Sequence, residues 1–417
     1  MSEKLHSTRL FNASCFALVT TAMTFAIRAG ILGQLGTEFV LNDTQLGWVN
    51  SMAFLGFPLA MIVGGLLYNF LGPRILMWAA FISHLLGIIL TITAGGFWGL
   101  LISTFLIGFA NGMVEAGCNP MIADMFPSDQ TTMLNKFHVW FPGGIVIGAL
   151  VSKFMTDFGM GWEAQVGVIL VPTLAYAYLI FGQAFPENKN IVTSTSTNIK
   201  SLLSPLYLFT IICMTLTATS ELGTQQWVEK LLGNAGASPM LVLALVTGLM
   251  AVGRYFGGPL IHKLKPTGIL WGSAVVTTLG IFLMSHATGG LTYLAAIVFA
   301  IGVCYFWPTM IGFTSEYISK TGPLGMSLMG GAGMFATSLW HPVIGGWLDS
   351  AREEALASGL DSSAAELMAG QTTLGNLVLF PVVLIGLFAI LYFWQKGRTE
   401  VATAFVSHST LKKPTMA

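Results

Sequence analysis

Twelve mostly apolar stretches, each about 20 residues long, follow one another along this chain of 417 residues. A helix of that length crosses the hydrocarbon core of a bilayer, so each stretch is predicted to be a membrane-spanning helix. Six spans are expected in the first half, at 12–35, 46–70, 75–95, 98–123, 137–157 and 165–185. Six more are expected in the second half, at 204–228, 239–263, 268–287, 291–315, 324–347 and 372–395.

The charge content agrees with burial in lipid and excludes a binder of nucleic acid. Only 9% of the residues are charged, whereas an ordinary soluble domain carries about 25%. Lys and Arg together number 18, as do Asp and Glu, so the net charge is zero and no basic field exists to attract phosphates. The sequence therefore predicts an all-α integral membrane protein.

The positions of Lys and Arg predict that both termini are cytoplasmic. Thirteen of these residues then fall on the inner side and three, Lys153, Lys230 and Arg352, on the outer side. This excess of inner cations follows the positive-inside rule. The inner residues are Lys4, Arg9, Arg74, Lys136, Lys189, Lys200, Lys263, Lys265, Lys320, Lys396, Arg398, Lys412 and Lys413.

A polar segment divides the spans into two halves. We expect a cytoplasmic N-terminus at 1–11, a six-helix bundle at 12–185, a cytoplasmic linker at 186–203, a second bundle at 204–395 and a cytoplasmic tail at 396–417. The acidic segment that begins at Asp349 is expected to face outward and to form a short surface helix. The four cysteines fall inside spans and are interpreted as packing residues, neither disulfides nor metal ligands.

The halves repeat a short motif, which resembles the major facilitator superfamily. GGLLYNFLGPR at 64–74 and GGPLIHKLKP at 257–266 each end a helix with small residues and continue into a short turn with a cation. The superfamily has Gly-x-Leu-x-Asp-x-x-Gly-Arg between its second and third helices. Gly65, Gly72 and Arg74 match approximately, while Asn69 replaces the Asp. The resemblance implies two pseudo-symmetric six-helix bundles and a gating or structural role for these four residues.

Ionisable residues inside spans are candidates for function because insertion of an Asp or Glu at the centre of a bilayer costs about 2.5–3.5 kcal/mol. Glu115 lies in the fourth span, where Asn111 and Asn119 are spaced four residues to either side of it. These three residues share one face of a helix. The two amides serve either as hydrogen-bonding glue between helices or, with Glu115, as a site in a water-filled cavity.

Three more charged residues lie inside spans. Arg28 and Glu221 each lie about seventeen residues into the first helix of their half, so at 1.5 Å per residue they are expected at similar depth. We therefore hypothesise that they face each other across the cavity and pair in one conformational state. The alternatives for Arg28 are a static structural pair, a gate, or an anchor for a substrate carboxylate. Arg254 lies nearer the cytoplasmic end and is expected to have a structural or gating role.

The motifs EAGCNP and MLNKFHVWFPGG resemble the fucose–proton symporter family within the superfamily. That family has Glu-x-x-x-Asn-Pro in its fourth helix, matched by Glu115 and Asn119, and Leu-Asn-x-x-Gln in its fifth, matched by Asn135 with His138 in place of Gln. The resemblance implies that Glu115 binds sugar and takes part in proton coupling, and that His138 contacts sugar. The first helix departs from the family, because it carries Arg28 and Gln34 instead of an Asn and an acidic residue.

Aromatic side chains offer a second kind of solute contact. Trp227 and Trp307 lie on spans or at their ends, where sugar rings stack on such faces. Tryptophans at these places also form interfacial belts or face lipid, so both interpretations stay open.

The absence of a GxxxxGK[ST] loop argues against direct use of ATP, and the absence of an HExxH motif argues against intramembrane hydrolysis. We expect no cofactor and no enzyme. We expect a monomeric secondary transporter in the cell (inner) membrane, working by alternating access on a small solute. The first hypothesis is proton-coupled symport of a sugar or polyol, with Glu115 as the proton and substrate site. The second is transport of a sugar acid or other organic anion held by Arg28. The third is a membrane sensor that has lost transport.

Overall fold

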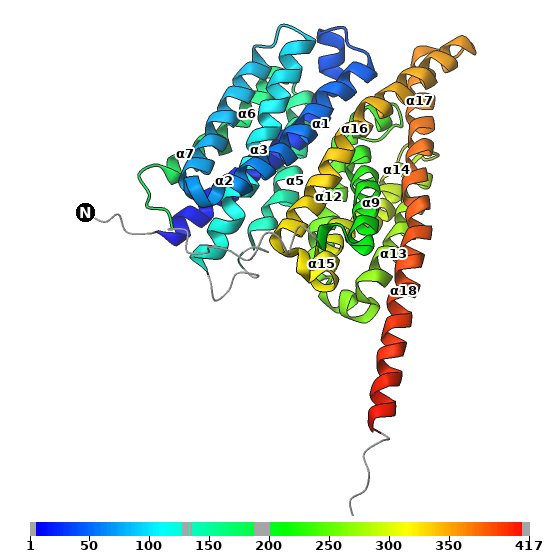
Figure 1. Cartoon of the computed structure of the whole chain (residues 1–417). Coiled ribbons are helices and arrows are strands. Elements are labelled where there is room, and N and C mark those ends of the chain that lie inside the picture. The colour runs from blue at the N-terminus through cyan, green and yellow to red at the C-terminus, as the bar shows by residue number, and fades with distance from the viewer. Residues whose placement is uncertain (1–5, 127–132, 134–135, 187–200, 411–417) are drawn as a thin grey trace, which may run out of the picture.

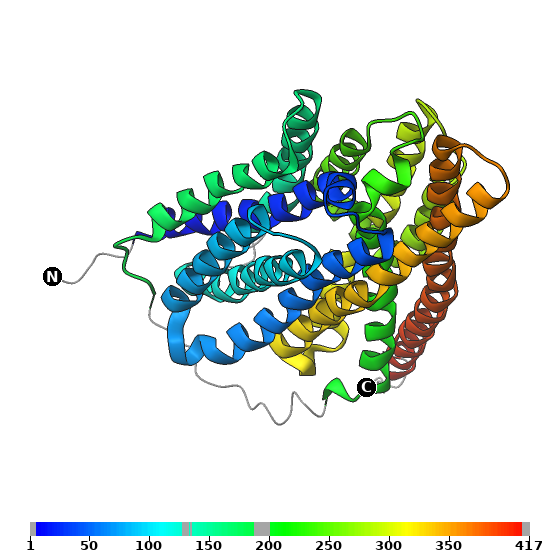
Figure 2. The same ribbon diagram turned by 90° about the horizontal axis from the view of Figure 1, so that it is seen from above.

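The computed structural model describes residues 6–126, 133, 136–186 and 201–410, and the described chain is helical with no strand. Eleven of its helical stretches are long and apolar enough to cross a membrane. Helices from the first half gather into one bundle and helices from the second half into another, and the two bundles lie side by side (Figures 1 and 2). The prediction of an all-α, two-bundle membrane protein is thereby confirmed.

The first bundle contains the elements from α1 to α7. A capping box between Asn42 and Gln45 stabilises the start of its second helix, α2. That helix is continuous in outline and bends at Gly72, so it covers two of the predicted spans. The bounds are α1 (Ser7–Glu38), α2 (Asp43–Ile92), α3 (Phe97–Met125), α5 (Trp140–Asp157), α6 (Trp162–Val168) and α7 (Leu170–Ile180).

The second bundle repeats this arrangement with more interruptions. Its first span is built from α9 (Pro205–Ala218), a five-residue π-helix η1 (Thr219–Gly223) and α10 (Thr224–Gln226). The remaining elements are α11 (Val228–Leu232), α12 (Pro239–Phe256), α13 (Gly258–Met284), α14 (Leu291–Val303), α15 (Phe306–Tyr317), η2 (Ser319–Thr321), α16 (Gly322–Ala357), α17 (Ser362–Leu377) and α18 (Leu379–Thr410).

The repeated motif found in the sequence forms equivalent bends in the two bundles. Gly72 has φ 73° and precedes Pro73, while Lys265 has φ 60° and precedes Pro266. Glycine adopts a positive φ without steric cost, whereas the Cβ atom of lysine makes this conformation strained. The two bends therefore share a geometry although their residues differ.

The structure corrects two expectations about helix ends. The first helix begins at Ser7, five residues before the predicted start. No separate surface helix forms after Asp349, because α16 continues to Ala357 and α17 begins at Ser362, where the Asp361 side chain caps it. The predicted span at 324–347 lies within α16 and is not among the eleven apolar stretches. Several glycines and His341 lower its hydropathy.

The bundles touch along α2 and α16, where glycines permit close approach of the two backbones. A Cβ atom on Gly47 would lie 2.4 Å from the carbonyl oxygen of His341, and one on Gly345 would lie 2.1 Å from that of Asp43. We call the side of the molecule where α1 ends at Glu38 and α2 begins the distal side, and the opposite side the proximal side.

An apolar cluster extends this contact across the interface. Phe25, Phe54 and Phe57 of the first bundle are buried in it with Leu222 and Met334 of the second. Its partly buried members include Phe141 and Trp307. Hydrophobic side chains therefore seal the centre of the interface between the bundles.

Gly108 tests how tightly the first bundle is packed. A Cβ atom there would lie 2.2 Å from the carbonyl oxygen of Ala53, so Gly108→Val must push α2 and α3 apart. We expect a loss of stability of about 1–3 kcal/mol, visible as a lower thermal-unfolding midpoint of the detergent-solubilised protein. The control is Gly272→Ala, because a Cβ atom there would meet no heavy atom within 4 Å from the rest of the described chain beyond its own helix backbone. Equal midpoints for both variants would contradict the packing described.

Candidate functional site

Glu115, Asn119 and His138 form a connected polar cluster between α3 and the segment before α5. Asn119 Nδ2 donates a hydrogen bond to Glu115 Oε2 at 2.7 Å, and Asn119 Oδ1 lies 3.1 Å from His138 Nε2. Since this amide oxygen only accepts, His138 Nε2 is the donor in this contact. Glu115 is buried, whereas His138 is exposed. The cluster therefore links a carboxylate in the membrane span to an accessible ring.

Asn111, the third member of the predicted stripe, points elsewhere. Its Oδ1 accepts from His84 Nε2 at 2.8 Å, and its Nδ2 donates to Thr24 Oγ1 at 3.0 Å. The other nitrogen of His84 lies 3.0 Å from the Tyr176 hydroxyl. All of these side chains are buried inside the first bundle. Of the two interpretations, the geometry therefore favours interhelical hydrogen bonding for Asn111.

Arg28 joins the two bundles through neutral amides. Its Nε donates to Asn50 Oδ1 and its Nη2 to Gln226 Oε1, both at 2.9 Å. The guanidinium carbon lies 5.1 Å from the ring centre of Phe25 and 5.8 Å from that of Phe54, within the range of cation–π attraction. The side chain is thus held by polar and aromatic groups, and no carboxylate contacts it in the described part of the chain.

Arg28 and Glu221 do not pair in this conformation, so their pairing in another state stays a hypothesis. The first helix begins at Ser7 and not at residue 12 as expected, so Arg28 lies farther along the helix than expected. Counted from the true helix starts, Ser7 and Pro205, residue 226 is as far along its helix as residue 28. Glu221 pairs instead with Arg254, whose Nη2 lies 3.6 Å from Glu221 Oε1.

The two tryptophans have different environments. Trp307 is half-buried, lies near Gly330 and Gly333 of α16, and borders the apolar cluster between the bundles. Trp227 is fully buried, and its Nε1 donates to His341 Nδ1 at 2.9 Å. In this conformation Trp227 is therefore a core residue and offers no face to a solute, whereas Trp307 stays a candidate.

The remaining predicted residues lie away from this cluster or outside the description. Gln34 lies at the distal end of α1, with Nε2 3.5 Å from Thr156 Oγ1. Gly65 and Arg74 are exposed near the bend at Gly72. Asn135 lies outside the described residues, as does the side chain of Asn69.

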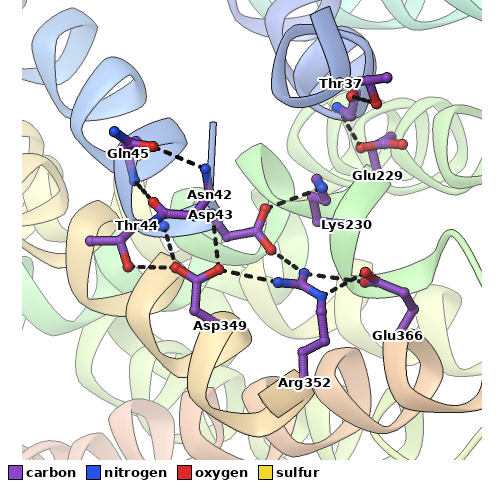
Figure 3. Close-up of polar contacts among 11 residues, drawn as sticks. Thr37, Asn42, Asp43, Thr44, Gln45, Glu229, Lys230, Asp349, Arg352 and Glu366 are labelled. Atoms are coloured by element: carbon purple, nitrogen blue, oxygen red, sulfur yellow. Dashed lines mark hydrogen bonds and ion pairs between the residues drawn. The ribbon is translucent and has the colours of Figure 1, made fainter. Parts of the chain in front are cut away.

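A charged network closes the distal side, and Figure 3 shows it. Arg352 at the end of α16 contacts Asp43 of the first bundle, Asp349 at 3.1 Å and Glu366 at 2.6 Å. Lys230 lies 3.2 Å from the other oxygen of Asp43. We call these five residues the distal seam. They come from α2 on one side and from α11, α16 and α17 on the other.

Asp349 also caps a helix of the opposite bundle. Its carboxylate accepts from the backbone N–H groups of Asp43 at 3.0 Å and Thr44 at 2.8 Å, and from the Thr44 hydroxyl at 2.6 Å. These N–H groups belong to the first turn of α2, where they have no partner inside the helix. A carboxylate at this positive end of the helix is favourable.

Glu229 adds a further contact beside the seam. Its Oε2 accepts from the backbone N–H of Gly33 at 3.0 Å (Figure 3). The pKa of the Glu229 carboxyl is raised, mainly because the group is buried. The nearby Lys230 ammonium acts in the opposite direction and lowers this pKa. Polar contacts between the bundles thus cluster on the distal side, where the two halves are joined.

Sequence reasoning missed Asn50, Gln226, His84 and the whole distal seam. Only one sequence signal pointed toward the seam, which is the i, i+3 spacing of Asp349 and Arg352 on a helix. The partners of Arg28 are amides, and an amide in a membrane helix is not distinctive without its contacts.

Two helical bundles with polar groups along their interface define the architecture of a secondary transporter. The model of the Major Facilitator Superfamily matches residues 14–341. The chain therefore belongs to the Major Facilitator Superfamily.

Curated relatives match part of the chain. Myo-inositol transporter 1 of Candida albicans is 28% identical over 145 residues, which cover 34% of this chain and 26% of that protein. The D-xylose transporter of Levilactobacillus brevis is 27% identical over 158 residues, which cover 37% of this chain and 34% of that protein. The matches thus span about a quarter to a third of the length of these relatives. The family and these relatives are transporters, not enzymes.

Solved structures share the fold over nearly the whole chain. A bacterial homologue of the human lysosomal transporter Spinster, in an inward-facing and occupied conformation, aligns with TM-score 0.77 and 13% identity. The alignment covers 93% of this chain and 97% of that one. A D-xylose–proton symporter aligns with TM-score 0.71 and 13% identity over 89% of this chain and 97% of that one.

The contacts of the distal seam are expected to hold the distal ends of the two bundles together. Arg352→Gln removes the cation that three carboxylates share, so we expect the distal ends to move apart in a larger fraction of molecules. Spin labels at the exposed positions Val40 and Ser358 would report this as a shift of their distance distribution toward longer values.

The matched control is Lys153→Gln, which breaks a pair within one helix, Lys153 with Asp157, and leaves the seam intact. Identical distance distributions in Arg352→Gln and the unmodified chain would show that the seam does not hold the distal side.

Proposed function

We propose that the protein is a secondary active transporter that carries a sugar or sugar-like solute together with a proton by alternating access. The observation that carries this proposal is the Glu115–Asn119–His138 cluster, a buried carboxylate hydrogen-bonded toward an exposed ring. The sugar and polyol transporters among its relatives support the solute class. A monomer in the cell membrane, with residues 12–185 rocking against 204–395, completes the proposal.

The excess of Lys and Arg on the proximal side makes that side cytoplasmic in this proposal. The distal seam then faces the outside, and the structure is the conformation closed to the exterior. Breaking the seam and the Arg28–Gln226 hydrogen bond would open the solute path outward. The bends at Gly72 and Lys265 lie at proximal helix ends in both bundles, where they are placed to follow this motion.

Glu115 supplies the coupling step. In this proposal a proton arriving from outside neutralises the Glu115 carboxylate. The protonated group donates a hydrogen bond as well as accepting one, and a sugar hydroxyl matches that pair. Asn119 and His138 would offer further donors and acceptors to the same solute. Loss of the proton to the cytoplasm restores the carboxylate and releases the solute.

A second candidate, transport of a sugar acid or other organic anion, is favoured by the surroundings of Arg28. The guanidinium is buried and is held by neutral amides, and Asn50 Nδ2 is buried without a hydrogen-bond partner. A buried cation and an unpaired donor next to each other suit a carboxylate. Opening of the distal side would free Arg28 from Gln226 and expose both donors.

Glu115→Gln tests the proton step. The amide cannot ionise, so we expect the variant to exchange labelled solute across proteoliposomes while failing to accumulate it against a gradient. The assay compares counterflow with uptake driven by a pH gradient. Accumulation equal to that of the unmodified protein would refute the role of Glu115.

Arg28→Gln separates the two solute classes. If the solute is neutral, uptake of neutral sugars should persist, whereas an anion anchored by Arg28 should lose at least about tenfold in apparent affinity, the equivalent of roughly 1.4 kcal/mol. The control is Gln226→Ala, which breaks the same inter-bundle hydrogen bond but keeps the charge. Equal losses for Gln226→Ala and Arg28→Gln would assign Arg28 to the contact between the bundles and not to the solute.

A further inference from the structure

Glu221 lies in the five-residue π-helix η1, which interrupts the first span of the second bundle. A π-helical turn widens the helix and often marks a functional site. The Glu221 side chain is only 8% exposed, and its Oε2 is buried without a hydrogen-bond partner. Its charged contact is Arg254 Nη2, 3.6 Å from Oε1, which is beyond hydrogen-bond distance. A buried carboxylate held so loosely is costly unless it can be neutralised.

Arg254 contacts a second irregular segment, the break in the tenth span between the end of α14 at Val303 and the start of α15 at Phe306. Proline has no N–H, so Pro308 leaves the carbonyl of Cys304, four residues earlier, without its helical donor. Arg254 Nε donates to that carbonyl at 2.9 Å. Its Nη2 is buried without a hydrogen-bond partner, although the side chain as a whole is 26% exposed. Arg254 therefore stays anchored through Nε whether or not Glu221 is charged.

Few other ionisable groups face this pair. The Cys304 thiol lies close enough to interact electrostatically with Arg254 and Glu221. Its Sγ donates a hydrogen bond to the Met250 carbonyl oxygen at 3.5 Å. The Tyr305 hydroxyl beside it donates to the Gly253 carbonyl at 2.9 Å. The described residues of η1, α9, α10, α16 and α18 add no further charged group in contact with Glu221.

We infer that Glu221 is a second proton-exchange site, distinct from Glu115 and controlled by Arg254. A proton binds to Glu221 Oε2, the ion pair breaks, and Arg254 keeps its bond to Cys304 while its Nη atoms turn to water or solute. Deprotonation reverses each of these changes, so charge is conserved apart from the one proton carried. This inference rests on the proposed proton coupling, and it adds a second proton per cycle.

Infrared difference spectroscopy of the full chain in nanodiscs tests the site without a known solute. Spectra recorded between alkaline and acidic buffer report each carboxyl that gains a proton. We expect Glu221→Gln to lose one carboxylic-acid band that Glu115→Gln retains. Arg254→Gln removes the neighbouring cation, so the midpoint of that band should move to higher pH by about one unit or more. The control is Asp157→Asn, which removes an exposed carboxylate in a helix-surface pair.

Two results would overturn the inference. One is a Glu221→Gln spectrum equal to that of the unmodified chain. The other is a carboxylic-acid band whose pH midpoint does not change in Arg254→Gln. Arg254→Lys keeps the charge and should leave the midpoint close to its original value, which shows that the shift is electrostatic. If the band behaves as expected but a pH gradient drives no uptake in the unmodified protein, the proton site stands and the proposed symport fails. The two claims are therefore tested separately.

Discussion

A charged side chain inside a bilayer needs a partner from the protein, and this constraint decides where the functional groups of this chain lie. Four such residues meet it in different ways. Glu115 accepts from an amide on its own helix, and Arg28 donates to amides of two other helices. Glu221 and Arg254 share a long ion pair. Glu221 Oε2 and Arg254 Nη2 remain buried without a hydrogen-bond partner.

The same constraint divides the interface between the bundles into layers. The distal seam is charged and lies at the helix ends, the Arg28 contacts form a polar layer below it, and the apolar cluster around Phe54 forms the centre. Each layer contains residues from both bundles, so opening the distal side must break all three. Asp349 belongs to two of the distal contacts, because its carboxylate caps α2 and binds Arg352 at the same time.

Apolar patterning was sufficient to predict the membrane-spanning helices, because each span must satisfy its own backbone within lipid and therefore forms a helix of known length. The division into two bundles came from the polar segment between the halves and from the family resemblance. The sequence also predicted the spacing that brings Glu115 and Asn119 together, since residues four apart share a helix face. The contacts between helices could not be predicted from the sequence. Because α1 begins at Ser7, Arg28 lies farther along its helix than expected. In this conformation it contacts Gln226, while Glu221 contacts Arg254.

The central claim is that solute and proton cross the membrane together, and one measurement tests it most directly. Proteoliposomes containing the unmodified protein and an internal pH-sensitive dye receive neutral or carboxylated sugars from outside, with no pH gradient imposed. The account predicts that the interior acidifies with the same time course as the entry of the transported sugar. Entry of labelled sugar with a constant internal pH would contradict proton symport.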